Sequence, residues 1–229
     1  MITRYLKAFI SLLYPELCAG CMRSLYEHEE LICTHCLYHL PVTNFHLDAK
    51  NAAGKQLWGR VQVTAVASYL YYVKGTAVQN VLHQLKYFKK PEIASMLGKR
   101  YGAVLAASPF IDADLLVPVP LHPKKLKKRG YNQSEFFAKG LSEQFGLPVE
   151  SANLIRHTRT ESQTTKRRYE RYENMKDIFE VLEPSAFAFK HLILVDDVLT
   201  TGATIEACAN KLLQIPGVRV SVLTLAYAT

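Results

Sequence analysis

Two adjacent acids follow an apolar run near the end of the chain, in LILVDDVLTTGAT at residues 192–204. The four apolar residues predict a short buried strand, and the small residues after the acids predict a turn into a helix. In an open parallel sheet, ligands bind at this carboxyl end of the strands. Free N–H groups, hydroxyl donors and the helix dipole would bind a phosphate there. The candidate phosphate ligands are Thr200, Thr201, Gly202, Ala203 and Thr204.

The acids Asp196 and Asp197 would repel that phosphate, so we expect them to contact another part of the ligand. Ionised carboxylates accept hydrogen bonds, and the vicinal hydroxyls of a sugar donate them well. A phosphate on the turn and a diol on the acids together describe a ribose 5-phosphate. The competing interpretation is a capped helix beside solvated acids, which would not require two neighbouring acids and a hydroxyl cluster together.

A run of cations, which we expect to form a loop, follows a second apolar segment, residues 115–119, in VPVPLHPKKLKKRGYNQSE. Its members are Lys124, Lys125, Lys127, Lys128 and Arg129. A later polar stretch, residues 157–175, adds further cations, among them Arg159 and Arg171, and has little to bury. Lysine and arginine bind pyrophosphate and a nucleic-acid backbone alike. A solvated basic face is the third interpretation of these runs.

Four of the five cysteines form two Cys-x-x-Cys pairs, Cys18 with Cys21 and Cys33 with Cys36. Two such pairs supply the four thiolates of a tetrahedral zinc site. Because four thiolates fill every coordination position, we expect a structural zinc. The alternative is a dithiol redox pair. The fifth cysteine, Cys208, falls on the inward side of a predicted helix.

The composition is globular, with 229 residues of which 49% are hydrophobic. Its formal net charge of +8 suits an anionic partner such as nucleic acid, a phosphorylated metabolite or a membrane surface. Short apolar runs alternate with helical spacing, which predicts an α/β fold with a parallel sheet flanked by helices. We expect a domain boundary near residue 60, between an N-terminal module, 1–60, and an α/β domain, 61–229.

Helical periodicity marks several segments. In two of them the predicted inward stripes are Val78, Val81, Leu82 and Leu85, and Ile205, Cys208, Ala209 and Leu212. At the N-terminus, residues 1–17 also predict an amphipathic helix, too short to span a bilayer. It would pack on the protein or make a weak contact with a membrane surface. We expect a cytoplasmic protein.

Residues 192–204 resemble the phosphoribosyl-pyrophosphate (PRPP) motif of type I phosphoribosyltransferases at every constrained position. The resemblance implies that Asp196 and Asp197 hold the ribose 2′- and 3′-hydroxyls, and that the threonine-rich turn holds the 5′-phosphate. It also implies that the cation run contacts pyrophosphate, with Mg²⁺ bridging the phosphates. Residues 157–175 correspond to a loop that closes over the substrate. Arg159 and Arg171, with the two acids, are the catalytic candidates.

Together with the four-cysteine ribbon, this motif makes the chain similar to the ComF family, which includes the GntX proteins. The stretch TRTESQTTKRRYERYENM fits a family signature at Arg159, Gln163, Thr164, Arg171 and Asn174, although TTKRR is more polar than the family pattern. With no segment after the last predicted strand, residues 1–60 would form the hood over the active site.

The resemblance implies a role in natural transformation, in which single-stranded DNA is handled at the cytoplasmic side with competence proteins as partners. Two hypotheses follow from it. The chain is a binding protein for PRPP or nucleic acid that acts as a sensor or adaptor, or it is an active phosphoribosyltransferase that releases pyrophosphate and modifies an unknown acceptor.

Overall fold

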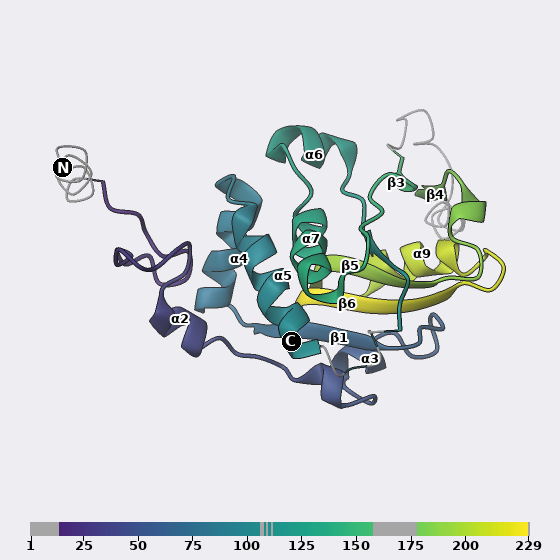
Figure 1. Ribbon diagram of the computed structural model, residues 1–229, viewed down its shortest axis with the longest axis horizontal. Coiled ribbons are helices and arrows are strands. Elements are labelled where there is room, and N and C mark those ends of the chain that lie inside the picture. Colours follow the sequence, from purple (N-terminus) through teal and green to yellow (C-terminus); the bar gives the residue numbers. More distant parts are fainter. Residues whose placement is uncertain (1–13, 106–107, 109, 111, 158–177, 229) are drawn as a thin grey trace, which may run out of the picture.

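The computed structural model describes residues 14–105, 108, 110, 112–157 and 178–228 (Figure 1). Its centre is a four-stranded sheet in the order β1-β6-β5-β2, in which every neighbouring pair is parallel. The strands are β1 (Val66–Tyr72), β2 (Leu115–Pro118), β5 (His191–Leu199) and β6 (Arg219–Ala228). A smaller antiparallel pair is formed by β3 (Leu154–Arg156) and β4 (Phe179–Val181).

The central strands are buried on both faces, which explains their continuous apolar runs. Residues 192–195 of β5 have no exposed surface, and residues 220–226 of β6 are buried throughout. A parallel sheet covered by helices on both sides requires this pattern, in place of the alternation of a half-exposed sheet. The predicted fold class, a parallel α/β sheet flanked by helices and joined to a four-cysteine module, is confirmed.

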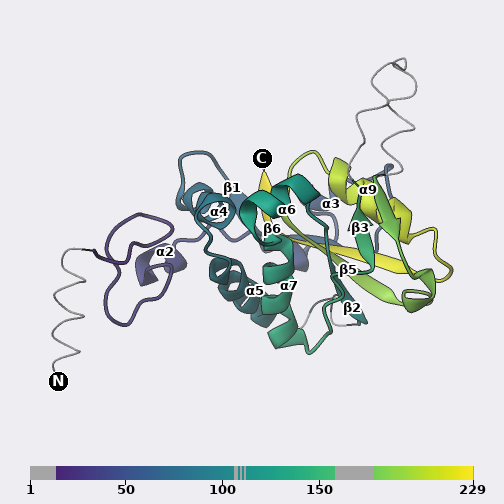
Figure 2. The same ribbon diagram turned by 90° about the horizontal axis from the view of Figure 1, so that it is seen from above.

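Helices cover both faces of the sheet. Figure 2 shows α5 and α7 on one side of β5 and β6, and α3 and α9 on the other. Their bounds are α3 (Ala52–Lys55), α4 (Ala77–Tyr87), α5 (Glu92–Val104), α7 (Gln133–Phe145) and α9 (Ala203–Leu212). The predicted stripes of α4 and α9 are all buried, because each helix turns its apolar side to the sheet.

The helices α5 and α7 pack closely because each carries a glycine at the crossing. A side chain at Gly140 would collide with the carbonyl oxygen of Ser95, and one at Gly98 would collide with that of Phe137. This close pair holds the first turn of α7 against the sheet. The residues at the start of α7 therefore belong to a closely packed pair of helices.

Residues 14–40, with the short helix α2 (Thr34–Tyr38), lie beside α4 at one end of the molecule (Figure 1). Asn80 of α4 donates from Nδ2 to the carbonyl oxygen of Gly20 at 2.7 Å. Residues 41–60, which include η1 (Phe45–Leu47) and α3, pack on the edge strand β1, where Asn51 donates to the carbonyl oxygen of Val66 at 2.8 Å. The division near residue 60 stays a prediction.

Several predictions fall on parts of the chain outside the described residues. Residues 1–13 of the N-terminal amphipathic helix and the loop that carries Arg159 and Arg171 are among them. Residues 14–17, the predicted end of that helix, are described and are not helical, and Leu17 forms a β-bridge with Ser24. Within the residues that are described, no helix has the length and apolar character needed to traverse a lipid bilayer.

Candidate functional site

The strand β5 carries the acid pair and is longer than the sequence predicts. A strand ending at Val195 is expected, whereas β5 continues through both acids to Leu199. The cause is β6, which pairs with β5 as far as Leu199 and Tyr227. On the other side, β2 stops at Pro118, opposite Val195. The acids therefore stand on a paired strand whose second edge is open for contacts with other elements.

The first turn of α7 holds both acids. Ser134 donates from its hydroxyl to Asp196 Oδ1 at 2.9 Å, and Gln133 donates from Nε2 to Asp197 Oδ2 at 2.8 Å. Lys86, at the end of α4, places its ammonium nitrogen 3.1 Å from the same Asp197 oxygen. The carboxylates are thus oriented by neutral donors and one cation before any ligand binds.

Burial and the charge of Asp197 raise the pKa of Asp196 to about 7. The hydrogen bonds from the Asp197 amide and the Ser134 hydroxyl, together with the charge of Lys86, oppose this rise. Near neutral pH, Asp196 therefore exists in both protonation states. A carboxylate with this pKa can exchange a proton at physiological pH as well as accept hydrogen bonds.

The cation run forms a short helix, α6 (Pro123–Arg129), where the sequence analysis predicts a loop. His122 caps its start by accepting from the amide of Lys124 at 3.1 Å, and Pro123 suits the first helical position. Gly130, with a φ of 88°, ends it in the left-handed conformation. Neighbouring side chains of a helix point in different directions, so only some cations of the run can face the same site.

One cavity of about 430 Å³ unites these elements. It is lined by both acids and by cations from three elements or their flanks, α4, α6 and β3: Lys86, Lys89, Lys125, Lys128, Arg129 and Arg156. Lys124 and Lys127, on the outer side of α6, are exposed and do not line it. Neighbouring acids and a ring of cations suit a ligand with both hydroxyl groups and phosphates.

The sequence analysis did not assign Lys86, Gln133 or Ser134 to the site. Gln133 and Ser134 follow Asn132, which caps α7 by accepting from the Ser134 amide at 3.2 Å. The sequence offered one signal for Gln133 and Ser134, namely a polar Asn-Gln-Ser start of a helix directly after a basic run. Lys86 offered none, because its pairing with Asp197 depends on how α4 packs.

The threonine-rich turn lies between β5 and α9. Thr204 lines the cavity, whereas Thr200, Thr201, Gly202 and Ala203 do not. Gly202 has a φ of 76°, and a Cβ there would come within 2.8 Å of Leu57 Cδ2. Both its backbone conformation and this close approach favour glycine.

Side chains from the segment after α3 hold the carbonyl groups of this turn. Arg60 donates from Nη1 to the carbonyl oxygen of Thr201 at 2.6 Å and from Nε to Glu206 Oε2 at 2.9 Å. Gln56 donates to the carbonyl oxygen of Thr200. The turn therefore has its carbonyl oxygens tied to residues 56–60, and this contact was not expected from the sequence.

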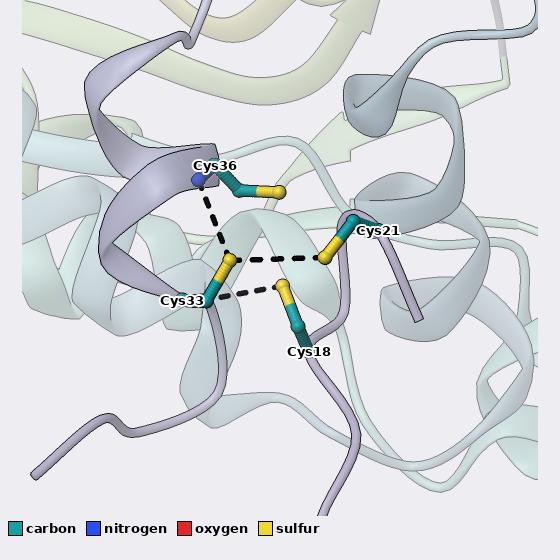
Figure 3. A group of neighbouring side chains, drawn as sticks. All are labelled: Cys18, Cys21, Cys33 and Cys36. Carbon is teal, nitrogen blue, oxygen red and sulfur yellow. Dashed lines mark hydrogen bonds between the residues drawn. The ribbon is translucent and has the colours of Figure 1, made fainter. Parts of the chain in front are cut away.

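The four cysteines of the two Cys-x-x-Cys pairs converge (Figure 3). All four sulfur atoms lie within 4.8 Å of one another, and Cys21 Sγ lies 3.7 Å from Cys33 Sγ. Among the described residues these thiols form no disulfide. Backbone amides donate to the sulfurs, from Cys33 to Cys18 at 3.2 Å and from Cys36 to Cys33 at 3.4 Å.

This arrangement fits a zinc ion. Tetrahedral zinc with Zn–S bonds of about 2.3 Å places its sulfur ligands about 3.8 Å apart, close to the separation of Cys21 and Cys33. Burial opposes ionisation of Cys18, but donation from the amides of Cys33, Cys21 and Gly20 outweighs it and lowers its pKa to about 7. Burial raises the pKa values of Cys33 and Cys36, and a metal ion would ionise these thiols as it binds. The geometry of the cluster allows it to hold a metal such as zinc through four thiolates, as predicted.

No family model matches the chain. Among solved structures, it is similar to the glutamine PRPP amidotransferase of B. subtilis, with a TM-score of 0.42, 21% identity, and coverage of 61% of this chain and 30% of that one. A hypoxanthine phosphoribosyltransferase from Staphylococcus aureus gives a TM-score of 0.36 and 15% identity over 61% of this chain and 64% of that one. These scores are low, so the fold assignment rests on the sheet described above.

Among curated proteins, the chain is 30% identical to the DNA utilization protein YhgH of Escherichia coli over 203 residues, 86% of this chain and 84% of that protein. It is 32% identical to competence protein F of Haemophilus influenzae, over 46% of each chain. It is 34% identical to competence protein ComFC of Bacillus subtilis, over 44% of this chain and 38% of that protein. The identity to the first of these extends over most of both chains, and on this ground the chain belongs to the ComF family.

Proposed function

We propose that this chain binds PRPP, or a related ribose 5-phosphate, together with Mg²⁺ at the carboxyl edge of its sheet, and that it acts on single-stranded DNA during DNA uptake. The observation that carries the proposal is the cavity in which two acids and six cations face one another. The acids lie on the strand that the PRPP motif predicts, and the cations come from elements far apart in the sequence.

Each part of the ligand has a matching group in this proposal. Asp196 and Asp197 accept the ribose hydroxyls, and the start of α9 at Thr204 receives the 5′-phosphate. Lys125, Lys128 and Arg129 contact the pyrophosphate, as charge-assisted donors do. Mg²⁺ arrives with the substrate, since it prefers phosphate and carboxylate oxygens and keeps some of its waters.

The DNA role is supported by the positive net charge of the chain and by the names of its relatives. The chain has a formal net charge of +8, and the outer side of α6 keeps Lys124 and Lys127 outside the cavity, free for a second anion. Its relatives are named for DNA utilization and for competence. The proposal places the protein in the cytoplasm, with competence proteins as partners, where a four-thiolate zinc site stays reduced. A weak membrane contact through residues 1–17 stays a prediction.

Catalysis is the second candidate function. A phosphoribosyltransferase would displace pyrophosphate from the ribose with an unknown acceptor. Asp196 favours this candidate, because a carboxylate with a pKa of about 7 is suited to remove a proton from an attacking group.

Ligand titration calorimetry tests the PRPP site. With Mg²⁺ present, we expect Asp196→Asn/Asp197→Asn to bind PRPP about 100-fold more weakly than the wild type, as the loss of two charge-assisted contacts implies. Asp48→Asn, at an exposed acid that does not line the cavity, is the control and should bind normally. Equal affinity in the double variant and the wild type would refute the assignment.

Measurement of pyrophosphate release separates the two functions. The protein is incubated with PRPP, Mg²⁺ and individual nucleobases or amines. Tight binding without release supports a sensor or adaptor. Release that depends on one acceptor and is lost in Asp196→Asn supports the enzyme.

The two sides of α6 give a matched pair for the DNA role. Lys124→Glu/Lys127→Glu should weaken single-stranded DNA binding and flatten its salt dependence, since each lost phosphate contact lowers the slope by about 0.7. The same variant should keep its PRPP affinity. Lys125→Glu/Lys128→Glu should lose PRPP affinity as well, because these lysines line the cavity. An unchanged salt slope in both variants would limit the protein to a small-molecule role.

A further inference from the structure

Two aromatic side chains are exposed where α4 ends. Tyr87 is 62% exposed and Phe88 is 56% exposed. His83, one turn earlier and also exposed, lies against both, with ring centroids 4.8 Å from Tyr87 and 5.6 Å from Phe88. We call His83, Tyr87 and Phe88 the aromatic cluster.

The aromatic cluster has no role in the core of the protein. The opposite side of α4 faces the sheet with Val78, Val81, Leu82 and Leu85, all of them buried. The apolar packing that holds α4 in place is therefore complete without the three exposed rings. Exposed large aromatic side chains grouped on one surface indicate a binding function.

Cations border the aromatic cluster and connect it to the cavity. Tyr87 lines the cavity between Lys86 and Lys89, so one ring of the cluster faces the same space as the acid pair. His83 and Phe88 lie beyond the lining, and on the facing helix Lys124 and Lys127 also lie beyond it. Aromatic side chains of α4 and cations of α6 are therefore exposed outside the cavity as well as along it.

We propose that the aromatic cluster stacks unpaired bases of single-stranded DNA whose phosphates are bound by Lys89 and the outer lysines of α6. This inference rests on the DNA role proposed above and specifies where the bases bind. Proteins that bind single strands without regard to sequence combine a cationic path for the backbone with aromatic rings on which bases stack. A duplex would not bind in this way, because its bases are already stacked on each other.

The charge around the cluster favours this occupant over a protein partner. The two exposed rings, Tyr87 and Phe88, lie in the sequence KYFKK at residues 86–90. One lysine precedes them, two follow them, and no acid lies between. Lys86 already pairs with Asp197, but an apolar protein surface would leave the ammonium groups of Lys89 and Lys90 without counter-charges. A single strand supplies both a phosphate for each cation and a base for each ring.

The test compares DNA with bases to DNA without them. An oligo(dT) of ~20 nucleotides and an abasic oligonucleotide of the same length carry equal charge, and stacking contributes about 1–3 kcal/mol per base. We expect Tyr87→Ala/Phe88→Ala to bind oligo(dT) at least about tenfold more weakly, and to bind the abasic strand as the wild type does. Tyr87→Trp/Phe88→Trp should restore oligo(dT) binding. Tyr38→Ala, an aromatic residue of the cysteine module that is 85% exposed, is the matched control.

The outcomes separate this inference from the proposed function. If the alanine variant keeps full affinity for oligo(dT) while Lys124→Glu/Lys127→Glu loses it, the stacking inference is wrong and the DNA role stands. If the alanine variant loses affinity for both strands equally, the rings do not act through bases and the inference is again wrong. If wild-type protein binds neither strand, the DNA role itself is wrong. The proposed PRPP site is still tested separately, by the calorimetric measurement of PRPP affinity.

Discussion

The cysteine cluster and the carboxyl-edge cavity are built in opposite ways. The cluster takes four like ligands from one short segment, residues 18–36, and brings their sulfur atoms within 4.8 Å of one another. The cavity takes unlike groups from α4, α6, α7, β3, β5 and α9, and sets acids against cations. A site made from one segment can be recognised by spacing alone. A site made from six elements is complete only when the sheet is folded.

The two sites also differ in what their charges need. Backbone amides donate to the sulfurs, and a Zn²⁺ ion would offset two of the four thiolate charges. In the cavity, Lys86 neutralises Asp197 already, while Asp196 has a raised pKa. The cluster therefore suits a permanently bound metal, and the cavity holds an unbalanced set of charges suited to a ligand that binds reversibly.

Removal of the metal should have the largest effect. We expect about one zinc per chain, and its loss in Cys33→Ser/Cys36→Ser should unfold residues 14–40 and make them sensitive to proteases, because metal binding supplies the folding free energy of such modules. Cys208→Ala, on α9, should retain the metal. Elemental analysis that finds no zinc in gently purified protein would contradict the assignment. PRPP affinity should fall far less than in the double Asp variant, because no residue of the cluster lines the cavity.

Loss of Arg60 should have an intermediate effect. Arg60 holds the Thr201 carbonyl and Glu206, so Arg60→Ala frees the turn that we propose receives the 5′-phosphate. We expect PRPP to bind about tenfold more weakly by calorimetry, as the loss of one charged hydrogen bond at a partly exposed position implies. Arg60→Lys should recover part of the affinity, and Lys55→Ala, exposed on α3, should change nothing. If Arg60→Ala binds PRPP normally, the turn does not depend on this contact.

The protonation of Asp196 should give the smallest effect. Its pKa rises from an ordinary value of 3.8 to about 7 in the folded protein. The fold therefore favours the protonated acid, and stability is lost as the pH rises from about 4 through 7. Asp196→Asn should match the wild type only below about pH 4, and its advantage in stability should grow by at least about 1 kcal/mol between pH 5 and pH 8, or about 2–4 °C in Tm. Thermal denaturation at the two pH values measures this, and a constant difference between them would show that Asp196 does not titrate there.

Much of the fold could be predicted because burial leaves a clear pattern. The apolar residues 192–195 predicted a central strand, and the stripes of α4 and α9 predicted their inward sides correctly. The errors have physical causes as well. β5 runs on through Asp196 and Asp197 because β6 offers hydrogen bonds there. α6 is helical because His122 and Pro123 begin it and Gly130 ends it, although the charge run obscures any apolar stripe.

The candidate site could be predicted only in part. The PRPP motif and the cation run named residues that line the cavity, namely Asp196, Asp197, Thr204, Lys125, Lys128 and Arg129. The assigned residues Lys124, Lys127, Thr200 and Thr201 are absent from its lining, since backbone geometry turns neighbouring side chains in different directions. Their roles stay predictions.

The sequence by itself determined the residue types and the local geometry: four thiols at knuckle spacing, two acids after an apolar strand, and a glycine turn at a helix start. These depend on neighbours along the chain, whose separation is set by the backbone. Only the tertiary structure decided that Lys86 would pair with Asp197, that α7 would hold both acids and that Arg60 would hold the turn after β5. Such contacts join residues from distant segments, and packing of the helices on the sheet brings them together.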